Sequence, residues 1–115
     1  MANPVLIIVL VTCPHESVDI IARTLIDLKL AACVTAIPAN SFYYWNGQYC
    51  REEEDLLILK STKEVYPALE RQIKSIHPYE TPEIIAIKIT AVLREYAQWV
   101  ADQTKLDSGK KAKND

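Results

Sequence analysis

The sequence predicts one α+β domain with the ferredoxin-like order β-α-β-β-α-β and an additional C-terminal helix. Three observations predict this fold class. The chain opens on an unbroken apolar run, helix-like segments alternate with strand-like runs, and an Asn-Gly pair joins the two longest of those runs. This order implies a four-stranded antiparallel sheet that carries two helices on one face.

The first strand is expected over residues 5–12, VLIIVLVT. An unbroken run rich in β-branched residues suits a strand that is buried on both faces. The segment 16–30 then changes period and predicts the first helix. Its apolar stripe consists of Val18, Ile21, Ala22, Leu25 and Leu28.

Residues 32–45 and 48–60 are expected to form a long hairpin around Asn46-Gly47, because both residues of such a turn need a positive φ. A two-residue turn pairs Tyr44 with Tyr49, and Pro38 implies a bulge or an edge position. Fourteen residues of strand span about 45 Å, whereas a compact globule of this length is about 35 Å across. The aromatic end should therefore overhang the domain and pack on another copy in a closed assembly.

The second helix is expected to begin near residues 64–67 and to end at His77, immediately before Pro78. Ser61 and Glu64 have the spacing of a capping box at its start. Leu69, Ile73 and Ile76 form its apolar stripe. A strand over 83–90 and a last helix follow, the helix with a stripe of Leu93, Tyr96, Ala97 and Val100.

Composition excludes several classes of protein. A net charge of −2 lacks the basic excess of nucleic-acid binders, and two glycines leave no glycine-rich phosphate loop. Three widely spaced cysteines argue against a disulfide framework and indicate a reducing compartment, which we take to be the cytoplasm. The apolar run at the start is too short to span a membrane. We expect one domain over 1–105 and a polar tail over 106–115.

Four segments together resemble the CutA family of divalent-cation tolerance proteins. They are LAACVTAIP at 30–38, SFYYWNG at 41–47, EEEDLLILKST at 52–62 and HPYETPEI at 77–84. The resemblance implies a ferredoxin-like homotrimer with arms that extend across neighbouring copies, similar in shape to the PII signalling proteins. It also implies a link to copper or another divalent cation.

The resemblance implies a copper site only in part. A bacterial member of the family uses a first-strand cysteine and two adjacent histidines before the Pro-Tyr pair. The second histidine matches His77, but the first falls on Ile76, and the cysteine falls on Leu10, three residues before Cys13. The metal-ligand candidates are His77, Glu80, Glu83, Cys33 and Cys13.

Each candidate also has a structural interpretation. His77 could be a histidine at a helix C-terminus that bonds a carbonyl and complements the helix dipole. Cys33 could be a small buried residue, and Cys13 with His15 could be an ordinary loop. The run REEED at 51–55 is expected to form a solvated face. Glu80 and Glu83 could be solvated or paired.

We consider three functions. The first is a trimeric protein of divalent-cation tolerance that binds a copper-type ion and is not an enzyme. The second is a PII-like signalling module, with a small anionic ligand held between subunits by Lys60, Trp45 and Tyr79. The third is an enzyme with Cys33 as nucleophile and His77 as base, for which the sequence offers no recognisable motif.

Overall fold

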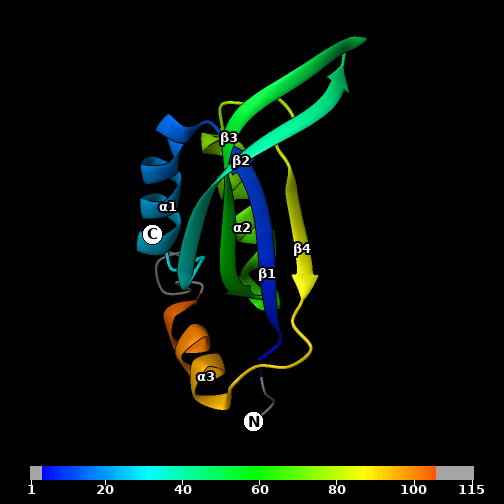
Figure 1. Ribbon diagram of the computed structural model, residues 1–115. Helices are drawn as coiled ribbons and strands as arrows, with labels where there is room; N and C mark the ends of the chain where they lie inside the picture. The colour runs from blue at the N-terminus through cyan, green and yellow to red at the C-terminus, as the bar shows by residue number, and fades with distance from the viewer. Residues whose placement is uncertain (1–3, 106–115) are drawn as a thin grey trace.

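The protein is described here by a computed structural model of residues 4–105. The polar tail expected over 106–115 lies outside the described residues. In chain order, the elements are β1 (Leu6–Cys13), η1 (His15–Ser17), α1 (Val18–Asp27), β2 (Cys33–Trp45), β3 (Gln48–Thr62), η2 (Lys63–Val65), α2 (Tyr66–Ile76), β4 (Ile84–Lys88) and α3 (Arg94–Gln103). Figure 1 shows these elements from the N-terminus to the C-terminus.

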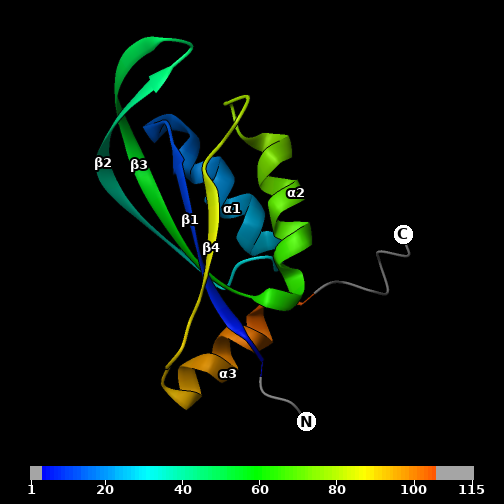
Figure 2. The same cartoon turned by 90° about the vertical axis from the view of Figure 1, so that its right-hand side faces the viewer.

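The sheet has the strand order β2-β3-β1-β4, and every neighbouring pair is antiparallel. Helices α1 and α2 lie side by side against one face of the sheet, and α3 crosses below it (Figure 2). The predicted α+β fold with the ferredoxin-like order is confirmed. The two inner strands are β3 and β1, so β2 and β4 form the edges.

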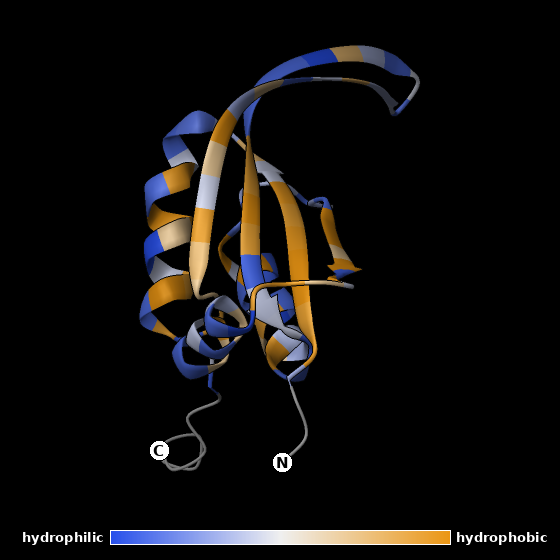
Figure 3. Ribbon diagram, turned by 60° about the horizontal axis from the view of Figure 1, so that its bottom comes forward, coloured by the Kyte–Doolittle hydropathy of each residue, from blue (hydrophilic) through white to orange (hydrophobic). Residues whose placement is uncertain are grey.

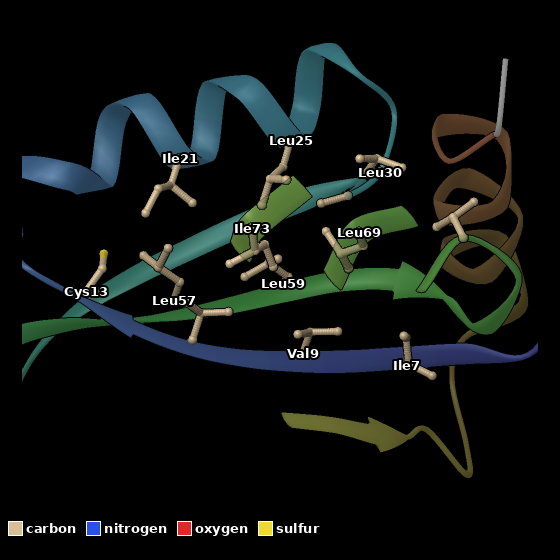
Figure 4. Close-up of a cluster of buried hydrophobic side chains, with 13 residues drawn as sticks. Ile7, Val9, Cys13, Ile21, Leu25, Leu30, Leu57, Leu59, Leu69 and Ile73 are labelled. Carbon is tan, nitrogen blue, oxygen red and sulfur yellow. The ribbon is translucent and has the colours of Figure 1, made fainter. Parts of the chain in front are cut away.

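The main core lies between the sheet and the two helices (Figure 4). Alternate residues of β1 and β3, such as Val9 and Leu57, are fully buried, because successive strand residues point to opposite faces. Ile21 and Leu25 of α1 meet them, as the predicted stripe requires. Leu28 departs from that stripe and is exposed, because α1 ends at Asp27.

Two prolines set the limits of α2 as predicted. Pro67 occupies the first turn of α2, and His77, just before Pro78, takes an extended backbone conformation with φ −77° and ψ 138°. The predicted capping box is wrong. Ser61 still belongs to β3, and its hydroxyl donates to the Leu30 carbonyl oxygen at 2.7 Å, so it is not available to cap the helix.

The hairpin overhangs the domain as predicted. Asn46 and Gly47 have φ values of 53° and 76°, and Tyr44 lies opposite Tyr49. Beyond the last β1–β3 pair, at Asp55, residues 39–54 pair only with each other, and we call this part the arm. The molecule measures 50 × 35 × 22 Å, which reflects this extension.

The sheet face away from α1 and α2 is apolar, and we call it the open face. A sheet with one solvated face normally presents polar residues there. Here the strands in the body of the domain are largely hydrophobic, whereas the outer part of β3 is largely hydrophilic (Figure 3). The apolar residues of the open face are Ile8, Leu10, Ile37, Leu56, Ile58, Ile85 and Ile87.

Helix α3 packs on a second, smaller cluster formed by Leu6, Ala32 and Val100, with Tyr96 beside it. Leu93, which the sequence assigned to the apolar stripe of this helix, precedes α3 and is exposed. Within the part of the chain that the structure describes, no helix is both long enough and apolar enough to cross a membrane.

Candidate functional site

His77 lies at the end of α2, and both nitrogens of its ring are engaged. Nε2 lies 2.8 Å from the carbonyl oxygen of Thr12, which can only accept, so Nε2 carries the proton and donates it. The backbone N–H of Tyr79 donates to Nδ1 at 3.1 Å. Strand β4 pairs with β1 only as far as Val11. The ring therefore binds the first β1 carbonyl beyond the end of that pairing.

Tyr79 connects the same loop to β3. Its hydroxyl donates to Glu54 Oε2 at 2.6 Å, and its ring lies 4.8 Å from that of His77. Burial raises the pKa of Tyr79, and the hydrogen bond and charge of Glu54 raise it further. Thr12, His77, Tyr79 and Glu54 thus form a hydrogen-bonded cluster that holds the loop 77–83 against two strands.

The expectation that residues 51–55 form a solvated face is wrong at its C-terminal end. Glu54 and Asp55 are only 5% and 7% exposed. Asp55 lies opposite Cys13 on the helix side of the sheet, and His15 Nδ1 of η1 lies 3.0 Å from its carboxylate. The sequence could not show this, because the loop and the short helix that cover these acids are distant along the chain.

Cys13 is fully buried opposite Asp55, which lies in the acidic middle segment of β3. Burial, followed by the charges of Asp55, Glu54 and Glu16, raises the pKa of its thiol to about 11. Because a metal binds the thiolate, Cys13 must lose its proton against this environment before it can act as a ligand.

Cys13 is expected to resist alkylation in the folded protein. At pH 8, a thiol of pKa about 11 holds about 100-fold less thiolate than one at 9.0. Iodoacetamide should therefore label Cys13 at least about 100-fold more slowly in the native protein than in urea. Peptide mass spectrometry over time measures this rate, with Cys50 on the arm as the internal control. Equal rates in both states would contradict the buried, protonated thiol.

The other predicted metal ligands lie apart. Glu80 borders a shallow hollow of about 320 Å³ that Glu70 and Lys74 also line, and Glu83 is exposed just before β4. Cys33 begins β2 and lies opposite Lys60, whereas Cys13 lies opposite Asp55. Five residues of β3 separate those positions, about 16 Å along the strand.

A single chain does not present these donors as one metal site. Across residues 4–105, no three side chains of His, Cys, Asp or Glu are arranged to hold a metal ion together. His77 could bind a metal through Nδ1 only if the Tyr79 N–H were displaced. The described residues of one chain therefore do not fit the predicted copper site without rearrangement or further ligands.

The three residues predicted to bind a small ligand are also far apart in one chain. Trp45 lies at the tip of the arm opposite Gln48, twelve residues of β3 before Lys60 and thus about 40 Å away along the strand. Tyr79 contacts β3 at Glu54, between them. Within one chain, these three residues therefore do not form a single site.

A separate hollow of about 570 Å³ lies between the base of the arm and η1. Four carboxylates border it, with Arg51 and His15 as the nearby cationic or titratable groups. The carboxylates are those of Glu16, Glu53, Glu54 and Asp55. Neither Lys60, Trp45 nor Tyr79 lines it, so it is not the ligand site that the sequence predicted.

The comparisons with known sequences agree on one family. The family model described as CutA1 divalent ion tolerance protein matches residues 7–103. The divalent-cation tolerance protein CutA of Thermus thermophilus is 40% identical over 99 residues, which cover 84% of this chain and 96% of the relative. Human protein CutA is 41% identical over 96 residues, and the match covers 82% of this chain but about half, 54%, of the relative.

Solved structures give the same fold. A protein of Nostoc described as a PII-like protein CutA superposes with a TM-score of 0.83 at 37% identity, over 87% of this chain and 98% of that one. A protein of Archaeoglobus fulgidus described as a periplasmic divalent cation tolerance protein CutA gives 0.84 at 33% identity, over 87% and 99%.

Proposed function

The chain belongs to the CutA1 family of divalent ion tolerance proteins, and on that premise we propose that it acts in divalent-cation tolerance as a closed homotrimer that binds a copper-type ion. The observation that carries the assembly is the open face, where Ile85 and Ile87 are each almost half exposed. A contiguous apolar face of this kind marks an interaction surface.

The arm supports the same assembly. Its tip carries five aromatic residues that are exposed in one chain, and such side chains are typical anchors of protein interfaces. They are Phe42, Tyr43, Tyr44, Trp45 and Tyr49. An arm that projects beyond its own domain reaches a neighbouring copy, and closed symmetry prevents such contacts from continuing into fibres.

We propose that the ion binds with modest affinity at a site that contact between subunits completes. His77 is the first candidate ligand, with Glu80, Glu83, Cys13 and Cys33 as further candidates. Imidazole and thiolate both suit copper. Completion by a second subunit is required because residues 4–105 of one chain do not gather three donors, and because His77 must exchange its bond with Tyr79 for one to the metal.

Calorimetric titration of the metal-free protein with Cu²⁺ tests this site. His77→Gln is expected to bind copper at least about tenfold more weakly than the unsubstituted protein, because an amide is a poor copper ligand. Glutamine can still donate to Thr12 and accept from Tyr79, so the loop is conserved as far as a substitution allows.

The matched control is His15→Gln, which removes the other imidazole at the same end of the sheet. Its copper affinity should equal that of the unsubstituted protein. Equal affinity in His77→Gln would refute the assignment of His77, and no heat of binding in any of the three proteins would refute copper binding itself.

A second candidate function is a PII-like signalling module with a small anionic ligand between subunits. It is favoured by the long arm and by the Nostoc relative, which is described as PII-like. Lys60, Trp45 and Tyr79 are the ligand-binding candidates, each supplied by a different part of the assembled surface. A shift of the thermal midpoint with anions or nucleotides would favour this function over metal binding.

We propose binding rather than catalysis. Cys33 and His77 are the nucleophile and base considered for an enzyme, and they lie toward opposite ends of the sheet. Cys33 is level with Ile8 of β1, whereas His77 bonds Thr12 of the same strand. Ile8 and Thr12 are four residues apart, or about 13 Å along the strand. We also propose a cytoplasmic location, since all three cysteines are free.

A further inference from the structure

One half-buried lysine of the open face has no acidic partner. Lys60 lies on β3, directly opposite Ile8 of β1 and Cys33 of β2. Its ammonium group donates to Thr35 Oγ1 at 2.8 Å and to the Ile58 carbonyl oxygen at 3.2 Å. Among the described residues, no carboxylate forms an ion pair with it.

Hydrogen-bond donors outnumber acceptors around this ammonium group. It has three N–H bonds, of which two are used by neutral acceptors. The Thr35 oxygen accepts from Lys60, which leaves the threonine O–H to donate, and within residues 4–105 it has no acceptor. One N–H of the Lys60 ammonium group and the O–H of Thr35 therefore both lack an acceptor among the described residues, on the same side of the sheet.

Assembly through the open face would make this arrangement costly. The open-face neighbours of Lys60 on β1 and β3 are Ile8 and Ile58, and the next strand adds Ile87. A charge that is transferred from water into such surroundings needs a partner of opposite charge, because the loss of its hydration is otherwise uncompensated. This step rests on the assembly proposed above and deepens the second candidate function, which also gives Lys60 an anionic ligand, but it does not rest on metal binding.

We propose that Lys60 and Thr35 form an oxyanion-binding site on the open face, which a carboxylate or phosphate group occupies in the assembled protein. The ammonium group supplies the charge and one hydrogen bond, and the Thr35 hydroxyl supplies a second hydrogen bond. The anion comes either from a free small molecule held between copies or from an acidic side chain of the neighbouring copy.

The test compares Lys60→Met with Lys63→Met in the full-length chain. Lys63 is exposed three residues further along, in η2, so its substitution removes the same charge outside the proposed site. Thermal midpoints are measured in sodium phosphate and in sodium chloride at equal ionic strength. Sedimentation velocity over a dilution series gives the dissociation constant of the assembly for each protein.

Two results support the site and distinguish its sources. If a free anion binds, saturating phosphate raises the midpoint of the unsubstituted protein and of Lys63→Met by about 4 °C or more, and leaves Lys60→Met unchanged. If a neighbouring carboxylate binds, phosphate has no effect on any protein, and Lys60→Met dissociates at least about tenfold more readily than Lys63→Met.

The proposal is overturned if Lys60→Met behaves like Lys63→Met in both measurements. It is also overturned if Lys60→Met is more stable than the unsubstituted protein in saturating phosphate as well as in chloride, because an unpaired buried charge is improved by an apolar replacement. If the unsubstituted protein sediments as a single chain, the assembly is wrong, and the phosphate dependence of the midpoint still decides whether Lys60 binds a free anion.

Discussion

Replacement of Ile85 by glutamate is expected to convert the assembled protein into single chains. Ile85 lies on the edge strand β4, points to the open face opposite Leu10 of β1, and is 49% exposed in one chain. If copies pack through this face, each substitution places a carboxylate in an apolar contact without a partner. A penalty of about 3 kcal/mol per contact weakens association more than about 100-fold.

Sedimentation velocity measures this effect directly, since one chain has a mass of 13.0 kDa and a trimer three times that value. Ile20→Glu is the matched control, because Ile20 is 60% exposed on α1, away from the open face. It should leave the assembly intact. A trimer that survives both Ile85→Glu and the equivalent change at Ile37, on the opposite edge strand, would show that the open face is not the interface.

The sequence predicted those parts of the fold that depend on local chemistry. Asn46 and Gly47 adopt the positive φ values that a two-residue turn needs, and they fix the register of both long strands. Pro67 and Pro78 determine where α2 begins and ends. The overhang of the arm followed from strand length alone, because strand geometry is nearly constant.

The site was harder to predict because its bonds join distant residues. Tyr79 reaches Glu54 across 25 positions, His15 reaches Asp55 across 40, and His77 reaches Thr12 across 65. In the sequence, Glu54 and Asp55 are simply the last two acids of a charged run. One signal was present: they immediately precede the unbroken apolar run at residues 56–59 of β3, so they enter the sheet while the earlier acids of the run extend into the arm.

His77 illustrates how a structural and a functional interpretation can apply to the same residue. The sequence offered a histidine that ends a helix or binds a metal. In the structure, its ring joins the end of α2 to β1 through one donated and one accepted hydrogen bond. Metal binding at Nδ1 would therefore release the backbone of Tyr79, and with it the loop that holds Glu54. Ion binding at this residue would be coupled to the conformation of the loop 77–83.

His77→Ala is expected to lower the free energy of unfolding by about 2–4 kcal/mol. The ring is only 8% exposed, and its loss leaves the Thr12 carbonyl and the Tyr79 N–H without their partners. Each unsatisfied buried group costs about 1–3 kcal/mol. His77→Gln should recover part of the loss, since an amide has one donor group and one acceptor that can replace both bonds.

Urea unfolding at one fixed protomer concentration measures the difference, because the stability of an assembly depends on concentration. Ser75→Ala is the control at the same end of α2: its hydroxyl donates to the Gln72 carbonyl oxygen on an exposed surface, and its removal should cost less than about 0.5 kcal/mol. If His77→Ala unfolds at the same urea concentration as Ser75→Ala, the ring does not hold the loop. Nδ1 of His77 would then be free to bind a metal without displacing the Tyr79 N–H. Ion binding would no longer be coupled to the conformation of the loop 77–83.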